Sequence, residues 1–389
     1  MKSDPIRTPL LLALASLLAT LAFCAGCADS SRTVEEPAPA PLGTLPLEYS
    51  RQFSIERFEG GYSLVHVADG RDYALVPRGA ARTTLGRPGA TVVETPCERI
   101  YLAASAATDL ILRLDALDRV ACCSASPKDC VFPEARAAID SGAITYVGKY
   151  AAPDYETLLN RDCRLALEST MITHAPKVRE QLERLGIPVF VERSNYESEP
   201  LGRLEWIKLY GALFGKEEEA TAYFEREKKK VETLVASLGE IDASRRKKVA
   251  FFYVSSNGYV NVRKPGDYLC KIIDVCGGVY ALDGLRLSES ESNALSTVNV
   301  DWEVFYRNAA DADVLIYNGA IGGGVASLEE LFAKNELFRE FKAVKTGDVW
   351  NSTANMYQEI GGIAELFSDF HTAISGDDDG ATRYLTRLK

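Results

Sequence analysis

Strand-like and helix-like segments alternate along most of this chain, and two long helical patterns interrupt the alternation once. In the first stretch, the predicted strands are residues 100–103, 120–124, 144–147, 165–168 and 188–191. Helical patterns at 201–214 and 216–238 follow, separated by Gly215, and the alternation restarts at 248–254. Strands that alternate with helices favour mostly parallel sheets covered by helices. The sequence therefore predicts an α/β protein in the order lobe, long helix, lobe, with a mostly parallel sheet in each lobe.

Residues 48–95 follow another pattern, in which short alternating segments meet at glycine turns. Segments 51–58 and 62–68 flank Glu59-Gly60-Gly61, and Asp69-Gly70 leads into 73–76. Such turns favour hairpins. We therefore expect a small antiparallel β meander joined to the first lobe, with a further strand at 91–94.

The first 27 residues have the three parts of an export signal. Lys2 and Arg7 precede an apolar run at 10–23, which is shorter than an ordinary membrane span and ends in Cys24-Ala25-Gly26-Cys27. A cysteine directly after small residues resembles a lipobox, in which the thiol of Cys27 is acylated. We expect residues 1–27 to be a lipoprotein signal peptide and residues 28–47 a flexible tether. The protein would then be extracytoplasmic and lipid-anchored to the cell membrane, on its outer face or in the periplasm. A plain secretion signal with an incidental cysteine is the alternative.

The chain is acidic and poor in metal-binding side chains. Its formal net charge is −11, and it lacks the basic surface that nucleic acid requires of a partner. Only three histidines are present and no CxxC motif follows Cys27, so no zinc or other protein-held metal site is expected. The folded part, roughly 340 residues, exceeds what one core usually covers, which fits two lobes.

Seven cysteines follow Cys27 along the chain, namely Cys97, Cys122, Cys123, Cys130, Cys163, Cys270 and Cys276. Disulfides can form outside the cytoplasm, but an odd number leaves at least one thiol unpaired. Cys122 or Cys123 with Cys130 is the best local candidate, because a loop containing Pro127 separates them. Buried free thiols are the alternative, and the sequence leaves both open.

The functional prediction depends on a series of short motifs. Segment 96–110 (PCERIYLAASAATDL) begins the first lobe, and 117–124 (LDRVACCS) follows it. The series continues through residues 147–150, 154–158, 182–187, 275–278 and 298–303. In order and spacing these motifs resemble the class III periplasmic binding proteins, which deliver cobalamin, ferric siderophores or haem to ABC importers. The resemblance covers the chain from about residue 96 to its end.

The resemblance implies a domain layout. Two Rossmann-like α/β lobes with mostly parallel sheets are expected at 96–200 and 241–389. The central helices at 201–240 would include the single long rigid helix that joins the lobes. The family also docks on its permease through one glutamate on each lobe, and Glu156 and Glu303 match those positions. Each lies in the first turn of a predicted helix, where a carboxylate stays ionised. The alternative is that both merely complement their helix N-termini.

Ligand-binding residues are expected between the lobes, on loops that follow the carboxyl ends of strands. Tyrosine rings would hold a flat macrocycle or catechol groups, and cationic side chains would meet carboxylates or the anionic oxygens of a siderophore. The candidates are Lys149, Tyr150, His174, Arg193, Tyr196, Arg203, Tyr259, Arg263 and Tyr357.

The predicted function is that of the substrate-binding protein of an ABC importer. It would capture an iron chelate (siderophore or haem) or a corrinoid and deliver it to the permease and its ATPase. We expect a monomer without catalytic residues or an intrinsic cofactor, for which a ferric siderophore, haem or cobamide is cargo. Two alternatives stay open: a lipid-anchored enzyme or cofactor-handling protein of similar two-lobed fold, and a surface adhesin that uses residues 48–95.

Overall fold

The computed structural model describes residues 38–286, 296–321, 323–377 and 380–389. The predicted signal peptide (1–27) with its Cys27, and the first part of the predicted tether (28–37), lie outside the described residues. In the described part of the chain, no helix has the length and apolar character needed to cross a bilayer.

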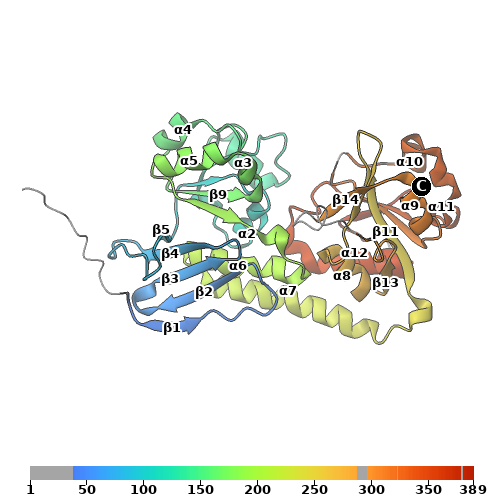
Figure 1. The fold of residues 1–389 in the computed structure, drawn as a ribbon, viewed down its shortest axis with the longest axis horizontal. Coiled ribbons are helices and arrows are strands. Elements are labelled where there is room, and N and C mark those ends of the chain that lie inside the picture. Colours follow the sequence, from blue (N-terminus) through green and yellow to red (C-terminus); the bar gives the residue numbers. More distant parts are fainter. Residues whose placement is uncertain (1–37, 287–295, 322, 378–379) are drawn as a thin grey trace, which may run out of the picture. The chain divides into compact units, whose positions relative to one another are not determined.

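A five-stranded sheet occupies the N-terminal part of the described chain (Figure 1). In spatial order, its strands are β1 (Pro41–Thr44), β2 (Phe53–Phe58), β3 (Ser63–Val67), β4 (Arg71–Pro77) and β5 (Thr91–Thr95). Phe53 and Ile55 of β2 are buried in the large core while Ser54 between them is exposed, which is the period-two pattern of a strand. Gly70 has a φ of 86°, which permits the tight turn from β3 to β4.

This region differs from its prediction in two ways. The predicted tether (28–47) extends too far, because Pro41–Thr44 pairs antiparallel with β2. The predicted meander is not wholly antiparallel, because β5 runs parallel to β4. Residues 78–90 cross from the end of β4 to the start of β5 instead of turning back as a hairpin, and the direction of β5 follows from that crossover.

The N-terminal lobe contains a parallel sheet of order β10-β9-β6-β7-β8. Its strands are β6 (Ile100–Leu102), β7 (Val120–Cys123), β8 (Thr145–Tyr146), β9 (Leu165–Ser169) and β10 (Val189–Glu192), and its helices are α2 (Ala107–Arg113), α3 (Pro133–Asp140), α4 (Tyr155–Asn160) and α5 (Pro176–Arg184). Leu165 and Leu167 of β9 enter the large core, whereas Ala166 enters a smaller core on the opposite face. The sheet is therefore covered on both faces, as a parallel sheet requires.

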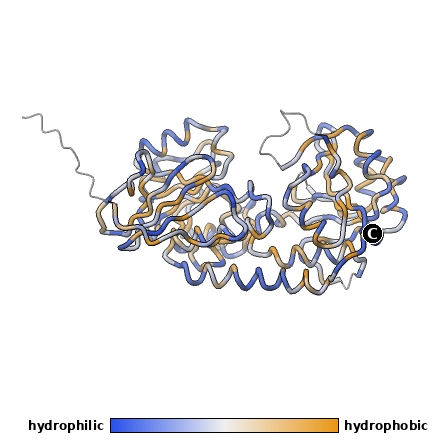
Figure 2. The backbone as a smooth tube through the Cα atoms, turned by 60° about the horizontal axis from the view of Figure 1, so that its bottom comes forward, coloured by the Kyte–Doolittle hydropathy of each residue, from blue (hydrophilic) through white to orange (hydrophobic). Residues whose placement is uncertain are grey.

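Two consecutive helices, α6 (Pro200–Phe214) and α7 (Glu217–Leu238), follow this lobe. Gly215 ends α6 in the left-handed conformation, with a φ of 68°. All of α6 is buried except Ala212. In contrast, hydrophilic and hydrophobic residues alternate along α7 (Figure 2), and its buried stripe consists of Ala220, Tyr223, Phe224, Glu227 and Val231.

The C-terminal lobe has a mixed sheet of order β14-β12-β11-β15-β16-β17, with β13 paired to β11. Its strands are β11 (Lys247–Val254), β12 (Val260–Arg263), β13 (Gly278–Tyr280), β14 (Thr297–Val300), β15 (Val314–Tyr317), β16 (Val349–Ser352) and β17 (Leu385–Arg387). Its helices are α8 (Tyr268–Val275), α9 (Trp302–Ala309), α10 (Leu328–Lys334), α11 (Lys342–Thr346) and α12 (Ile363–Ser375). β13, β11, β15 and β16 are parallel, and β12 and β17 run antiparallel to their inner neighbours.

Hydrogen bonds and ion pairs connect the two lobes. Oδ2 of Asp109, on α2, accepts a hydrogen bond from the backbone N–H of Gly361 at 2.5 Å. The hydroxyl of Tyr223, on α7, donates to the carbonyl oxygen of Gly361 at 3.1 Å. Lys271 of α8 forms an ion pair with Glu199, the residue before α6. The predicted fold class is confirmed: two α/β lobes with parallel-rich sheets and a long helix between them, preceded by a small β-sheet.

Residues 48–52 are attached to the start of the helical pair by two buried carboxylates. Glu205 accepts hydrogen bonds from the backbone N–H groups of residues 48, 49 and 50 at 3.0, 2.9 and 2.8 Å, and Lys208 pairs with it at 2.8 Å. Glu197 accepts from the backbone N–H groups of residues 51 and 52 at 2.9 and 3.0 Å. Burial alone would raise the pKa of Glu205, but Lys208 and the backbone donors lower it below its ordinary value, so the carboxylate stays ionised.

Candidate functional site

Polar side chains gather where the parallel strands of the N-terminal lobe end. Lys149 and Tyr150 follow β8, His174 follows β9, and Arg193 and Tyr196 follow β10. Because the carboxyl ends of parallel strands share one edge of a sheet, these five residues lie along the same edge. Lys149 and His174 are exposed, and Tyr150 packs against the smaller core. Among the described residues, no group of three or more histidine, cysteine, aspartate or glutamate side chains is arranged to hold a metal ion.

Arg193 and Tyr196 are in contact, but part of the charge of Arg193 faces the N-terminal sheet. The guanidinium carbon lies 4.1 Å from the centroid of the Tyr196 ring. Nη1 of Arg193 lies 3.6 Å from Oδ2 of Asp69, in the turn between β3 and β4, and Nε donates to Oε1 of Gln52 at 3.4 Å. Arg193 therefore links the N-terminal sheet to the edge of the lobe, which the sequence could not indicate.

Two buried arginines meet around Tyr268, the first residue of α8. The guanidinium carbon of Arg203, on α6, lies 4.2 Å from the ring centroid of Tyr268. That of Arg263, at the end of β12, lies 4.7 Å from the ring centroid of Tyr357 and its Nη2 donates to the Tyr357 hydroxyl. Arg203 and Arg263 are only 7% and 5% exposed. We call these four residues the arginine–tyrosine cluster, which unites three of the predicted ligand residues.

The arginine–tyrosine cluster contains two buried guanidinium groups, and that of Arg263 has a buried carboxylate beside it: its Nη1 lies 3.6 Å from Oδ2 of Asp267. Burial raises the pKa values of Tyr268 and Tyr357, so both phenols stay neutral. Burial alone would lower the pKa of Arg263, but Tyr357 and Asp267 raise it above its ordinary value. Within the described residues, neither Nε of Arg203 nor Nε of Arg263 has a hydrogen-bond partner. An unpaired buried N–H is costly, and an anionic oxygen is the partner that suits a guanidinium group.

Tyr259 lies apart from the arginine–tyrosine cluster. It is 46% exposed, at the turn between β11 and β12. Arg263 is at the other end of β12, and a strand rises about 3.3 Å per residue, so the two residues are separated by about 13 Å along the strand. Nε1 of Trp302 donates to the carbonyl oxygen of Gly258 at 2.9 Å, next to Tyr259. Tyr259 can line only a ligand that extends well beyond the cluster.

Glu156 and Glu303 are surface residues on different lobes. Glu156 is exposed in the first turn of α4, a helix that Asp154 caps by accepting from the backbone N–H of Thr157 at 3.2 Å. The side chain of Glu303, in the first turn of α9, is 84% exposed and pairs with Arg307 at 2.7 Å. An exposed i,i+4 pair of this kind is weak, so Glu303 remains available to a basic partner.

A buried carboxyl group near the same edge of the N-terminal lobe was missed by the sequence analysis. Glu168 of β9 is fully buried, and neither of its oxygens has a hydrogen-bond partner among the described residues. Burial raises the pKa of Glu168 to about 8, so the group is mainly protonated at neutral pH. Residues 165–168 have the pattern of an ordinary buried strand, and nothing in that pattern distinguishes Glu168 at its end as a buried carboxyl group without a partner.

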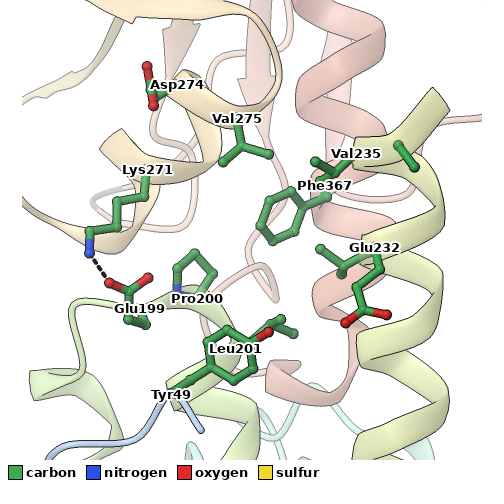
Figure 3. Close-up of a pocket in the computed structure, with 12 residues that line it drawn as sticks. Tyr49, Glu199, Pro200, Leu201, Glu232, Val235, Lys271, Asp274, Val275 and Phe367 are labelled. Carbon is green, nitrogen blue, oxygen red and sulfur yellow. Dashed lines mark hydrogen bonds and ion pairs between the residues drawn. The ribbon is translucent and has the colours of Figure 1, made fainter. Parts of the chain in front are cut away.

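A cavity of 580 Å³ lies between α7, α8, α12 and the start of α6 (Figure 3). Its wall is mainly apolar and includes Pro200, Val275 and Phe367, and the ion pair of Lys271 with Glu199 lies on one side of it. Lys271 lies one helical turn after Tyr268, so α8 contributes one residue to the arginine–tyrosine cluster and others to the wall of the cavity. None of the predicted ligand residues lines it. Most residues of its wall lie on helices, and the apolar ones among them fit the hydrophobic pattern of core positions. No pattern in the sequence therefore marks them as the wall of a cavity.

Comparison with known families identifies the fold. Residues 101–355 match the family model described as periplasmic binding protein, a stretch that runs from the first strand of the N-terminal lobe to beyond β16. The chain belongs to this family. The predicted resemblance to class III periplasmic binding proteins is thereby confirmed.

Two lipoproteins of Methanocaldococcus jannaschii are relatives of this periplasmic binding protein in sequence. Uncharacterized lipoprotein MJ0872 is 24% identical over 99% of this chain and 100% of its own length. Uncharacterized lipoprotein MJ0878 is 25% identical over 58% of this chain, and the match spans about half (51%) of MJ0878. The family is extracytoplasmic, and these two relatives are named as lipoproteins.

Solved structures of periplasmic binding proteins have the same fold. One from Veillonella parvula has a TM-score of 0.59 and 15% identity, covering 84% of this chain and 98% of its own. A periplasmic heme binding protein from Pseudomonas aeruginosa has a TM-score of 0.54 and 13% identity, covering 74% and 95%. The petrobactin-binding protein YclQ from Bacillus subtilis has a TM-score of 0.54 and 16% identity, covering 71% and 92%. These neighbours are binding proteins rather than enzymes.

Proposed function

We propose that this periplasmic binding protein is the substrate-binding component of an ABC importer, and that its cargo is an anionic metal chelate, a ferric siderophore or haem, or a corrinoid. The observation that carries the proposal is the arginine–tyrosine cluster, in which α6 and β12 each supply a buried guanidinium group with an unpaired Nε. Carboxylate or catecholate oxygens match these donors, and the tyrosine rings suit a flat ligand. Heme and petrobactin, named for two of the structural neighbours, belong to this chemical class.

In this proposal the chain binds and releases its cargo without covalent chemistry. Arg203 and Arg263 would neutralise the charged centre of the ligand. Residues at the edge of the N-terminal lobe would contact its outer part, namely Lys149, Tyr150, His174, Arg193 and Tyr196. Glu156 and Glu303 would pair with basic side chains of the permease, whose ATPase drives release. Acylated Cys27 would hold the protein at the membrane, with the residues up to 37 as its tether.

Binding titrations of the purified chain test the cargo. The panel contains haem, cobalamin, and ferric siderophores with carboxylate or catecholate groups, measured by calorimetry and by the rise in thermal midpoint. We expect at least one anionic chelate to bind with micromolar or tighter affinity. Arg263→Gln should weaken that binding by about 10- to 100-fold, because a hydrogen bond to a charged group contributes about 1.5–3 kcal/mol. Arg164→Gln, at an exposed arginine that pairs with Asp162 at 2.7 Å, is the matched control and should leave the affinity unchanged.

Arg203→Lys provides a second variant in case Arg263→Gln folds poorly, because it keeps the charge and loses the planar fork. Circular dichroism of each variant separates a loss of binding from a loss of fold. Unchanged affinity in both folded variants would contradict the assignment of the cluster as the ligand site. Turnover of a bound chelate would contradict a pure binding role and favour the enzyme alternative.

A further inference from the structure

The mainly apolar cavity where the two lobes meet has no part in the proposed cargo site. One side of its wall is the start of α6, including Leu201, and another side is Val275 of α8 with Phe367 of α12 (Figure 3). Helix α7 adds Val231 and Val235 to the wall. We call this space the junction cavity. A molecule bound in it would contact both lobes and the long helix between them.

The junction cavity has the size and the apolar floor of a small-molecule site. Its volume of 580 Å³ is within the range of about 300–1,000 Å³ that such sites occupy. Leu201, Val231 and Phe367 in its wall are only 6, 5 and 3% exposed, so they form the deep part of the cavity. Water finds few hydrogen-bond partners against hydrocarbon, whereas apolar molecules bind well in such a place. The floor therefore suits the apolar body of a ligand.

The mouth of the junction cavity is formed by exposed residues of α7. Val235 is 39% exposed, and Glu232, one helical turn before it, is exposed as well. Both residues belong to the wall, so the cavity opens to solvent beside them. An apolar floor below a carboxylate is the pattern expected for a ligand with an apolar body and a polar head.

The charges of the wall leave one carboxylate over. Lys271 pairs with Glu199, and Asp274 pairs with Arg246, so these four groups form two neutral pairs. Glu232 has no ion pair in the described part of the chain, and Lys228, one turn before it, pairs with Glu48 at 2.6 Å and with Glu225 at 3.6 Å. The mouth therefore attracts a cation and repels an anion.

The segment of chain that precedes the described residues does not match the junction cavity. Residues 28–37 have the sequence ADSSRTVEEP, in which Val34 is the only large apolar residue. Asp29, Glu35 and Glu36 in the same segment would be repelled by Glu232. A separate molecule is therefore the better occupant.

We propose that the junction cavity binds a small cationic amphiphile, a molecule with an apolar chain or ring and one ammonium group. The apolar body would fill the floor lined by Leu201, Val231 and Phe367, and the ammonium group would pair with Glu232 at the mouth. Tyr49, also in the wall, offers an aromatic ring to the same cation. This site is distinct from the arginine–tyrosine cluster, whose guanidinium groups suit an anion.

Displacement of a fluorescent probe from the purified chain tests the site. The probe is N-phenyl-1-naphthylamine, which is neutral and fluoresces in apolar surroundings. Decyltrimethylammonium and decyl sulfate, which share a chain length and differ in charge, are then added below their micelle concentrations. We expect the ammonium compound to displace the probe at a concentration about fivefold lower than the sulfate, the ratio that one exposed charge pair contributes. No binding of the probe, or equal displacement by the two compounds, would overturn the proposal.

Matched variants locate the binding in the junction cavity. Val235→Arg should weaken the binding of the probe and of decyltrimethylammonium by about tenfold, because it removes apolar wall and adds a like charge at the mouth. Val279→Arg, at a position of β13 that is 47% exposed and outside the wall, should leave both affinities unchanged. Glu232→Gln should keep the affinity for the probe but lose the preference for the cation, whereas Glu225→Gln, earlier on α7 and outside the wall, should keep that preference.

The same variants can refute the proposal. Equal effects of Val235→Arg and Val279→Arg, in chains that circular dichroism shows to be folded, would overturn it. Light scattering gives the oligomeric state, and a dimer that Val235→Arg dissociates would assign the cavity to a second copy of the chain instead. The test needs neither the cargo nor the importer, so its outcome is independent of the proposed function.

Discussion

Gly361 occupies a contact so close that one added methyl group should loosen the junction of the two lobes. A Cβ at this position would lie 2.8 Å from Oδ2 of Asp109, 2.9 Å from Nε of Arg113 and 2.9 Å from the hydroxyl oxygen of Tyr223. Each distance is well inside ordinary van der Waals contact, which is about 3.5–4.0 Å. Asp109 and Tyr223 are also the side chains that hydrogen bond to the backbone of Gly361, so neither can move without losing that bond.

The expected cost of Gly361→Ala follows from these two effects. Forcing a methyl group into a packed site costs about 1–3 kcal/mol. Displacing Asp109 from the N–H of Gly361 weakens a hydrogen bond to a charged group, which contributes about 1.5–3 kcal/mol. We therefore expect Gly361→Ala to lower the free energy of unfolding by about 3–5 kcal/mol in total.

Urea denaturation followed by tryptophan fluorescence measures this cost. Gly284→Ala is the matched control, because a Cβ at that exposed position has no atom within 4 Å, and we expect a change within about 0.5 kcal/mol. Hydrogen exchange at the amide of Gly361 gives an independent readout and should accelerate in Gly361→Ala. If the two variants unfold at the same urea concentration, the junction is not tightly packed and the reasoning is refuted.

Two further predictions concern carboxylates. The pKa of Glu168 is about 8 in the folded chain against an ordinary value of 4.5, so the folded state holds a proton that the unfolded state releases. This group should make the free energy of unfolding fall by about 1.4 kcal/mol per pH unit between those two pKa values, and Glu168→Gln should remove that contribution. Urea titrations at pH 5 and pH 8 should therefore show Glu168→Gln becoming more stable relative to the wild type as the pH rises. The same difference in free energy of unfolding between variant and wild type at both pH values would contradict this prediction. For docking, Glu156→Lys combined with Glu303→Lys should keep ligand affinity within about twofold but abolish uptake by cells, whereas Asp118→Lys, at an exposed acid of the N-terminal lobe, should not affect uptake. Uptake that persists in the double variant would exclude this docking role.

The features that the sequence predicted correctly depend on local signals. The helical patterns at 201–214 and 216–238 correspond within one residue to α6 and α7, because periodicity and Gly215 mark both ends of the turn. The alternation of strands and helices predicted both lobes. It also placed candidate residues after β8, β9 and β10, because parallel strands carry such loops to one edge.

The features that it missed depend on contacts between distant segments. β1 lies in a stretch rich in proline and is ordered by pairing with β2, which composition does not reveal. Arg193 meets Asp69 only because the N-terminal sheet packs against the lobe. No motif marks Tyr268, which meets Arg203 because α8 lies beside α6. Contacts of this kind leave no periodicity in the chain, so a single sequence cannot indicate them.

The attachment of residues 48–52 has a mechanical consequence. A strand pulled at its end unzips one hydrogen bond after another, so tension that arrives along the N-terminal segment would peel β1 from β2. The tension would then act on the five backbone amides of residues 48–52, which are hydrogen bonded to Glu197 and Glu205. These hydrogen bonds would bear the force together and would not break one after another. The force would pass into α6 and bypass the strands from β2 onward. A pulling force applied at the N-terminus could therefore be borne by this protein without distorting either lobe.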